Sequence, residues 1–152
     1  RIKRSLYIDM NSIRLCTEEL LEKFTHFELL KDYIEKKTKE VTDHNESNKI
    51  NTAELINGRR LTNVGTFRAY IEAYLQNNSK IHPEMTFLIR QLEPTDRGLP
   101  IQIYVFSNDI DWVRYEGIQA DIFDHLLAII PEFGLKVFQS PTGKDFSKLR
   151  SK

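Results

Sequence analysis

The side chains that could perform chemistry are few, and their spacing favours structural roles. The four histidines are isolated, with no second histidine or cysteine three to five residues from any of them: His26, His44, His82 and His125. A structural metal site needs several ligands held together, so this spacing predicts no metal site. The single cysteine, Cys16, would need a base from elsewhere to act as a nucleophile. We expect it to be a small buried hydrophobic side chain.

Two pairs of polar residues also invite a functional interpretation. Asp121 and His125 lie four apart, which places two side chains on one helix face, as in two members of a triad. No nucleophile lies beside them, so we expect a surface pair, or a boundary histidine hydrogen-bonded to backbone. Arg59 and Arg60 could hold an anion, although a solvated turn after Gly58 is the favoured interpretation.

One segment resembles an enzyme motif. The sequence NVGTFR, Asn63 to Arg68, resembles the phosphate-holding loop of acylphosphatases, small ferredoxin-like enzymes in which a glycine-containing loop enters a helix. Amides at a helix N-terminus bind anions readily. That loop should follow the first strand directly, yet more than fifty residues separate Ile8 from Asn63, and we expect Arg68 inside the helix. We therefore expect no enzymatic activity and no catalytic residue.

Composition bounds the remaining possibilities. Lysine plus arginine and aspartate plus glutamate number 22 each, so the formal net charge is zero, which argues against a dedicated nucleic-acid surface. One cysteine excludes an intramolecular disulfide and fits a reducing compartment. No apolar run approaches the roughly 20 residues that span a bilayer. The chain opens on Arg1 and enters a strand-like run by Ser5, so we expect a piece of a longer protein.

The stretch from Leu99 to Phe138 organises the predicted fold. Apolar residues alternate from Leu99 to Val105, which predicts a strand. From Trp112 the apolar residues fall three or four apart as far as Ile130, which predicts a helix. Gly134 follows where a left-handed cap is expected. The residues 135–138 then resume extended structure, and a crossover of this length predicts that they run parallel to the first strand.

The remaining elements follow from periodicity and turn residues. We expect strands at Arg4–Ile8 and Met85–Leu92, and a turn at 94–98 that makes an antiparallel hairpin with the strand from Leu99. The expected helices and loop are a helix at 13–21 with a second possible start at Thr17, a helix at Glu28–Val41, a mobile loop at Thr42–Asn51, and a helix from Thr62 or Asn63 to Asn77.

This order, β-α-β-β-α-β, predicts an α+β fold of the ferredoxin-like, split βαβ type. Its first crossover is too long for one helix, so approximately residues 12–61 are expected to form a helical insertion within a single domain, 1–152.

Three long segments carry a family resemblance: Lys3–Cys16, Leu61–Leu75 and Met85–Phe138, with RQLEPT, GLPIQIYVF and YEGIQADIFDHLLAIIPEFGLKVFQ as the most specific parts. They resemble the cytoplasmic C-terminal domain of the small-conductance mechanosensitive channel family, in particular its miniconductance, YbdG-type branch. The resemblance implies a tension-gated ion channel in the bacterial inner membrane that acts during osmotic downshock, with this domain at the cytoplasmic face.

The same resemblance implies a homo-heptamer around a water-filled vestibule, with a pore helix and a β domain upstream. Membrane contact would come only through N-terminal segments outside this sequence, and no cofactor, metal or nucleic acid is implied. The alternative is a small ferredoxin-like regulatory or ligand-binding domain, which an apolar pocket with converging polar groups would favour. An acylphosphatase-like enzyme is the third and weakest interpretation.

Overall fold

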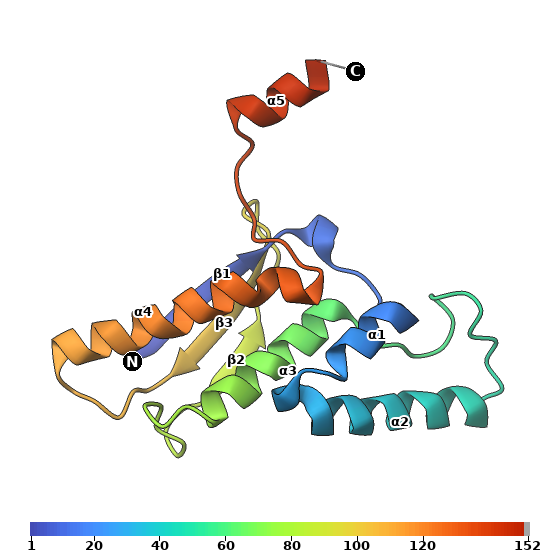
Figure 1. Ribbon diagram of the computed structural model, residues 1–152, viewed down its shortest axis with the longest axis horizontal. Helices are drawn as coiled ribbons and strands as arrows, with labels where there is room; N and C mark the ends of the chain where they lie inside the picture. Colours follow the sequence, from blue (N-terminus) through green and yellow to red (C-terminus); the bar gives the residue numbers. More distant parts are fainter. Residues whose placement is uncertain (151–152) are drawn as a thin grey trace.

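The computed structural model describes residues 1–150, a mixed α/β chain built on a small antiparallel sheet (Figure 1). Its three strands are β1 (Ile2–Ile8), β2 (Leu88–Gln91) and β3 (Leu99–Val105), in the order β1-β3-β2. The α-helices of the described chain are α1 (Glu18–Phe24), α2 (Lys31–Ser47), α3 (Asn63–Gln76), α4 (Trp112–Ile129) and α5 (Gly143–Arg150), and short 3-10 turns lie at Met10–Ser12 (η1), Glu28–Leu30 (η2) and Ile130–Phe133 (η3).

The sheet has one buried face because its side chains alternate. In the central strand β3, Ile101, Ile103 and Val105 are fully buried, and the intervening Gln102 and Tyr104 are only half-buried. The register pairs Ile2 with Val105 and Ile8 with Leu99, which puts the apolar residues of both strands into one core.

Helices α3 and α4 supply the other side of that core (Figure 1). Helix α3 buries Phe67, Ile71 and Leu75, four residues apart, and α4 buries Ile122, Phe123 and Leu126. Each helix begins at a side-chain cap: Thr62 Oγ1 accepts from the Gly65 amide at 3.0 Å, and Asp111 Oδ1 accepts from the Arg114 amide at 2.9 Å. Capping satisfies amides that the first helical turn leaves without a partner.

Phe133 ties the helices together from the turn after α4. Its ring centroid lies 5.5 Å from Phe24 and Phe27, 5.2 Å from Phe67 and 5.4 Å from Tyr70. These tilted and edge-to-face contacts are the preferred aromatic geometries. One side chain therefore links the α1 region, α3 and the end of α4.

The elements with strong apolar periodicity are confirmed. Helix α3 begins after the Thr62 cap and ends at Gln76, before the Asn77 cap; α4 begins at Trp112, and β2 pairs antiparallel with β3 as a hairpin. Gly134 has the expected left-handed backbone, at φ +67°, although it ends η3 and not α4 itself.

The predicted fourth strand is wrong. Residues 135–138 make only an isolated antiparallel bridge, Val137 to Ile8, supported by the Phe138 amide donating to the Tyr7 carbonyl at 2.9 Å. Since β1 runs antiparallel to β3, this segment still runs in the direction of β3. No strand residue follows Val137 before α5, and the chain leaves the sheet along the tether 139–142 (Figure 1). The strand predicted at 85–92 begins only at Leu88, and β1 begins two residues earlier than predicted, at Ile2.

Two predictions in the first half of the chain are also wrong in part. The helix predicted at 13–21 forms only from its second possible start: residues 13–17 are not helical, with Leu15 bridged to Thr62, and α1 begins at Glu18 after the Thr17 cap. The loop predicted at 42–51 is helical as far as Ser47. Asn45 explains the difference, because its side chain exchanges two hydrogen bonds with the Arg59 backbone and holds the polar end of α2 in place.

The stretch proposed as an insertion, 12–61, contains α1, η2, α2 and the following loop. Its two ends lie together, since the Cys16 amide donates to the Leu61 carbonyl at 2.8 Å. At the other end of the chain, α5 stands away from the body on the tether 139–142 (Figure 1). Among residues 1–150, no helix has the length and apolar character needed to cross a bilayer.

Candidate functional site

His125 lies against two tyrosines, which is not the expected arrangement. Its Nε2 is 2.6 Å from the Tyr70 hydroxyl, and its ring stacks on Tyr74 with centroids 4.4 Å apart. These contacts with two side chains of α3 stand in place of the expected backbone hydrogen bond or surface pair with Asp121. Burial, and secondarily the Asp121 charge, raises the pKa of Tyr74. The cluster is an interhelical packing contact.

Two of the other histidines make local contacts. His82 Nδ1 accepts from the backbone amides of Glu84 and Met85, and His26 lies 3.6 Å from Glu22 on the same face of the α1 region. His44 lies in the last turn of α2. Across the described chain, no group of three or more histidine, cysteine or acidic side chains is placed to hold a metal ion.

Cys16 is fully buried, as predicted. Burial raises the pKa of its thiol to about 11, although a hydrogen bond with Thr66 and the charges of Arg14 and Arg60 act in the opposite direction. A thiol with this pKa stays protonated near neutral pH, and the protonated form is a weak nucleophile. Cys16 therefore contributes packing.

The segment that resembles an acylphosphatase loop is the first part of α3. The Asn63 amide donates to the Arg14 carbonyl, and the Gly65 and Thr66 amides donate to Thr62. These amides are thus occupied by protein acceptors. Arg68 lies inside the helix, as expected, and its buried Nε has no partner in the described part of the chain.

Asn63 is a buried structural clamp that the sequence did not reveal. Its side chain is fully buried, accepts from the Arg14 amide at 3.0 Å, and donates to the Ser12 carbonyl at 3.0 Å and the Gly134 carbonyl at 3.4 Å. Buried polar groups are stable when their partners are in place. The Asn63 side-chain amide therefore holds together the start of α3, residues 12–14 and Gly134.

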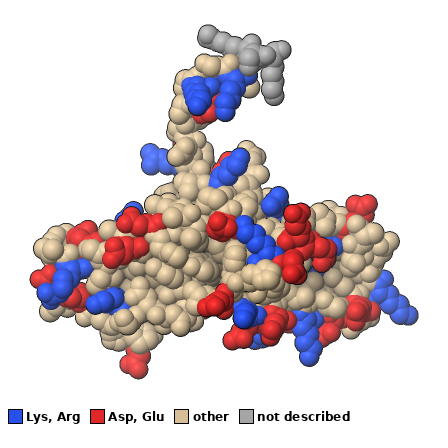
Figure 2. All heavy atoms as spheres, in the orientation of Figure 1, with Lys and Arg blue, Asp and Glu red and all other residues tan. Residues whose placement is uncertain are grey.

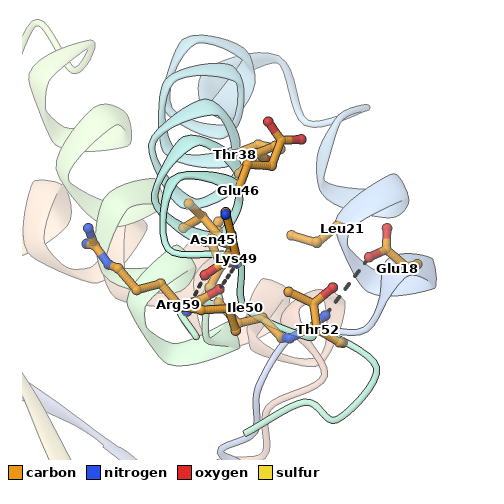
Figure 3. Close-up of a pocket in the computed structure, with 13 residues that line it drawn as sticks. Glu18, Leu21, Thr38, Asn45, Glu46, Lys49, Ile50, Thr52 and Arg59 are labelled. Carbon is orange, nitrogen blue, oxygen red and sulfur yellow. Dashed lines mark hydrogen bonds and ion pairs between the residues drawn. The ribbon is translucent and has the colours of Figure 1, made fainter. Parts of the chain in front are cut away.

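The structure contains a cavity of about 340 Å³ between α1, α2 and the 48–61 loop (Figure 3). Aliphatic side chains line part of it, and charged and hydroxyl side chains line the rest. The lining comprises Glu18, Leu21, Thr38, Val41, Thr42, Asn45, Glu46, Lys49, Ile50, Thr52, Arg59, Arg60 and Leu61.

Arg60 and Glu18 form an ion pair at this cavity, and Arg60 is the less exposed member of the pair. Its side chain is 12% exposed, whereas that of Glu18, 4.0 Å away, is 92% exposed. Nη2 of Arg60 donates to the Thr52 carbonyl at 2.9 Å. The expected solvated turn is wrong for Arg60 and fits only Arg59, which is exposed. Nothing in the local sequence distinguishes the two arginines, because folding of the loop over α2 decides which is covered.

A second, shallower depression of about 440 Å³ lies at the start of α4, beside Arg1. Ile110 and Trp112 line it and are 101% and 71% exposed, and Val113, next in the chain, is 77% exposed. Clustered exposed apolar side chains mark contact surfaces more often than isolated ones do.

No family model matches this chain. Functional assignment therefore depends on the residues and geometry described above.

Proposed function

We propose that this chain forms part of the cytoplasmic vestibule wall of a tension-gated channel, of the small-conductance mechanosensitive type, and performs no catalytic step. One observation carries the proposal. The three segments of resemblance, Lys3–Cys16, Leu61–Leu75 and Met85–Phe138, supply β2, β3, α4 and nearly all of β1 and α3. The resemblance therefore covers the elements that build the core, and it is not restricted to surface residues.

The finer fold assignment belongs to the same proposal. The antiparallel order β1-β3-β2, with residues 135–138 bridged to the free edge of β1, is the strand order of a ferredoxin-like sheet whose last strand is very short. In this assignment residues 12–61 are a helical insertion whose ends meet at Cys16 and Leu61.

A vestibule wall needs a stable fold and a hydrated lining. Acidic and basic side chains intermingle over the face seen in Figure 2, and the whole chain has no formal net charge. Exposed charges are screened within roughly 8–10 Å at physiological salt. Such a wall would discriminate only weakly between small ions.

Assembly as a homo-heptamer is implied by the resemblance, and the exposed Ile110, Trp112 and Val113 are candidates for subunit contacts. In the proposed channel, most contacts would come from membrane and β-domain segments. We expect the isolated chain to be a monomer or weak oligomer. Light scattering that finds a stable heptamer of this chain at micromolar concentration would contradict that expectation.

Recording from the full-length protein in a lipid patch tests the proposal. A small current that opens with membrane tension is expected, and its absence at every tension short of rupture would remove the channel assignment. The chain alone should neither bind liposomes nor hydrolyse acyl phosphates. Acyl phosphate turnover that is lost in Arg68→Ala would support the enzyme interpretation.

The second candidate function, a regulatory ligand-binding domain, is favoured by the cavity beside Arg60. Its aliphatic lining with converging polar groups is typical of ligand sites. The two functions are compatible, because a wall domain could also bind a regulator.

A further inference from the structure

Arg60 has hydrogen-bonding capacity that the protein uses only in part. A guanidinium carries five N–H donors. Nη2 has the Thr52 carbonyl at 2.9 Å, Nη1 is 4.0 Å from a Glu18 oxygen, and the buried Nε has no partner in the described chain. The enclosed Nε cannot meet a ligand, but Nη1 has only the long contact with Glu18, so an anion placed at Nη1 would stabilise this side chain.

Glu18 would compete only weakly with such an anion for the Arg60 guanidinium. Its side chain is 92% exposed, and its oxygen is at the outer limit of an ion pair with Arg60. An exposed carboxylate loses little when it turns into water. A ligand carboxylate could take its place in bidentate contact with the guanidinium.

The rest of the cavity favours an aliphatic body and a single negative charge. Leu21, Val41 and Ile50 provide apolar lining next to the charged end. Glu18, Glu46 and Lys49 also line the cavity, and Figure 3 shows the Arg59 side chain extending away from Leu21 and Glu18. With Arg60 and Lys49 offset by the two carboxylates, the lining has no excess positive charge to hold a dianion such as a phosphate monoester, and it suits a monoanion better.

We propose that the cavity of about 340 Å³ between α1, α2 and the 48–61 loop binds a small amphipathic carboxylate, with its head at Arg60 and its short aliphatic chain against Leu21, Val41 and Ile50. The volume lies at the small end of the range for ligand sites, about 300–1,000 Å³. The inference does not rest on the channel assignment, because binding is a property of this chain.

Titration of the chain with hexanoate, followed by calorimetry and by NMR shifts of α2 and the loop, tests the site. We expect a Kd of about 1 mM or tighter, at least about tenfold weaker binding of the uncharged hexanamide, and weaker binding of acetate. No saturable hexanoate binding, equal binding of hexanamide, or tighter binding of inorganic phosphate would overturn the proposal.

A basic residue outside the cavity provides the control variant. Arg60→Met should weaken hexanoate binding about tenfold or more, and Lys39→Met, at an exposed position of α2 that does not line the cavity, should leave it nearly unchanged. Equal effects of the two variants would overturn the assignment of the anchor. Val41→Phe keeps Arg60 and fills the apolar end, so it should weaken hexanoate more than acetate even if Arg60→Met does not fold. Equal hexanoate affinity in Val41→Phe and the unaltered chain would place the ligand elsewhere.

Discussion

The sheet with α3 and α4 differs from the helical arm, residues 18–61, in what holds it together. In the sheet body, apolar side chains from β1, β3, α3 and α4 meet in one buried cluster, and the partly buried Ile89 of β2 packs against it. In the arm, burial ends near its base: Leu30 and Ile34 are buried, but no residue from 35 to 60 is. The arm is maintained by caps and by bonds such as those of Asn45 with the Arg59 backbone.

This contrast indicates where stability and binding reside. Segments with few buried contacts open more easily than the core, and binding regions are often drawn from them. The cavity beside Arg60 lies entirely in the arm and at its edge, at Leu61. The body fixes the fold, and the arm is free to respond to a ligand.

The largest expected effect comes from removing the aromatic hub of the body. Phe133→Ala should lower the free energy of unfolding by about 3–5 kcal/mol, the usual cost of emptying a buried phenylalanine site. Phe133 is 1% exposed and contacts four other aromatic rings. Urea denaturation measures the change. The control is Phe146→Ala on α5, a 56% exposed site where almost no change is expected; similar losses in both variants would break the comparison.

A smaller loss should follow from a backbone conflict at the end of the body. Gly134→Val should cost about 1–3 kcal/mol, because φ is +67° and an added Cβ would lie 2.7 Å from an Arg14 nitrogen. Gly117→Val is the matched control, since nothing lies within 4 Å of a Cβ there. An unchanged urea midpoint in Gly134→Val would show that this cap is not under constraint.

The buried thiol predicts a pH dependence of stability. The pKa of Cys16 is raised from its ordinary value of 9.0 to about 11, so the unfolded state loses this proton at a lower pH than the folded state. Its stabilising contribution is present below pH 9 and is lost as pH rises toward 11, with a slope of up to about 1.4 kcal/mol per pH unit. The measurement is the difference between the unaltered chain and Cys16→Ala; parallel pH profiles would refute the burial argument.

The smallest global effect is expected in the arm. Asn45→Ala removes two hydrogen bonds to the Arg59 backbone, yet it should shift the global unfolding free energy by less than about 1 kcal/mol, because the site is exposed. Hydrogen exchange should instead show faster opening of residues 42–47, with α3 unchanged. A uniform rise in exchange across α3 and β3 would mean that arm and body unfold as one unit.

The sequence predicted the parts of the fold that have strong apolar periodicity. Helices α3 and α4, the hairpin and the Gly134 cap all combine such a pattern with a characteristic terminal residue. The prediction of a fourth strand was wrong because pairing with β1 depends on the tertiary geometry at Val137. The prediction of a loop at the end of α2 was wrong because the backbone of Arg59, distant in sequence, supports a helix that the local composition disfavours.

The candidate sites were less predictable than the fold. Burial of Cys16 followed from its residue type, but the Tyr70 partner of His125 and the Asn63 clamp join segments about fifty or more residues apart. Arg60 carried no local signal that separates it from Arg59. When the burial of a side chain depends on a loop that folds over a helix, the sequence shows no periodic pattern that predicts it.

The most direct test of the channel-wall proposal is the tension response of the full-length protein in a lipid patch, recorded with and without a substitution in this domain. Phe146→Ala and Trp112→Ser are suitable because both residues are exposed and outside the core. The account predicts a tension-activated current whose threshold or inactivation shifts more than its unitary conductance, since the narrowest constriction would lie in the pore helix. A protein that passes no current at any tension short of rupture would contradict the account.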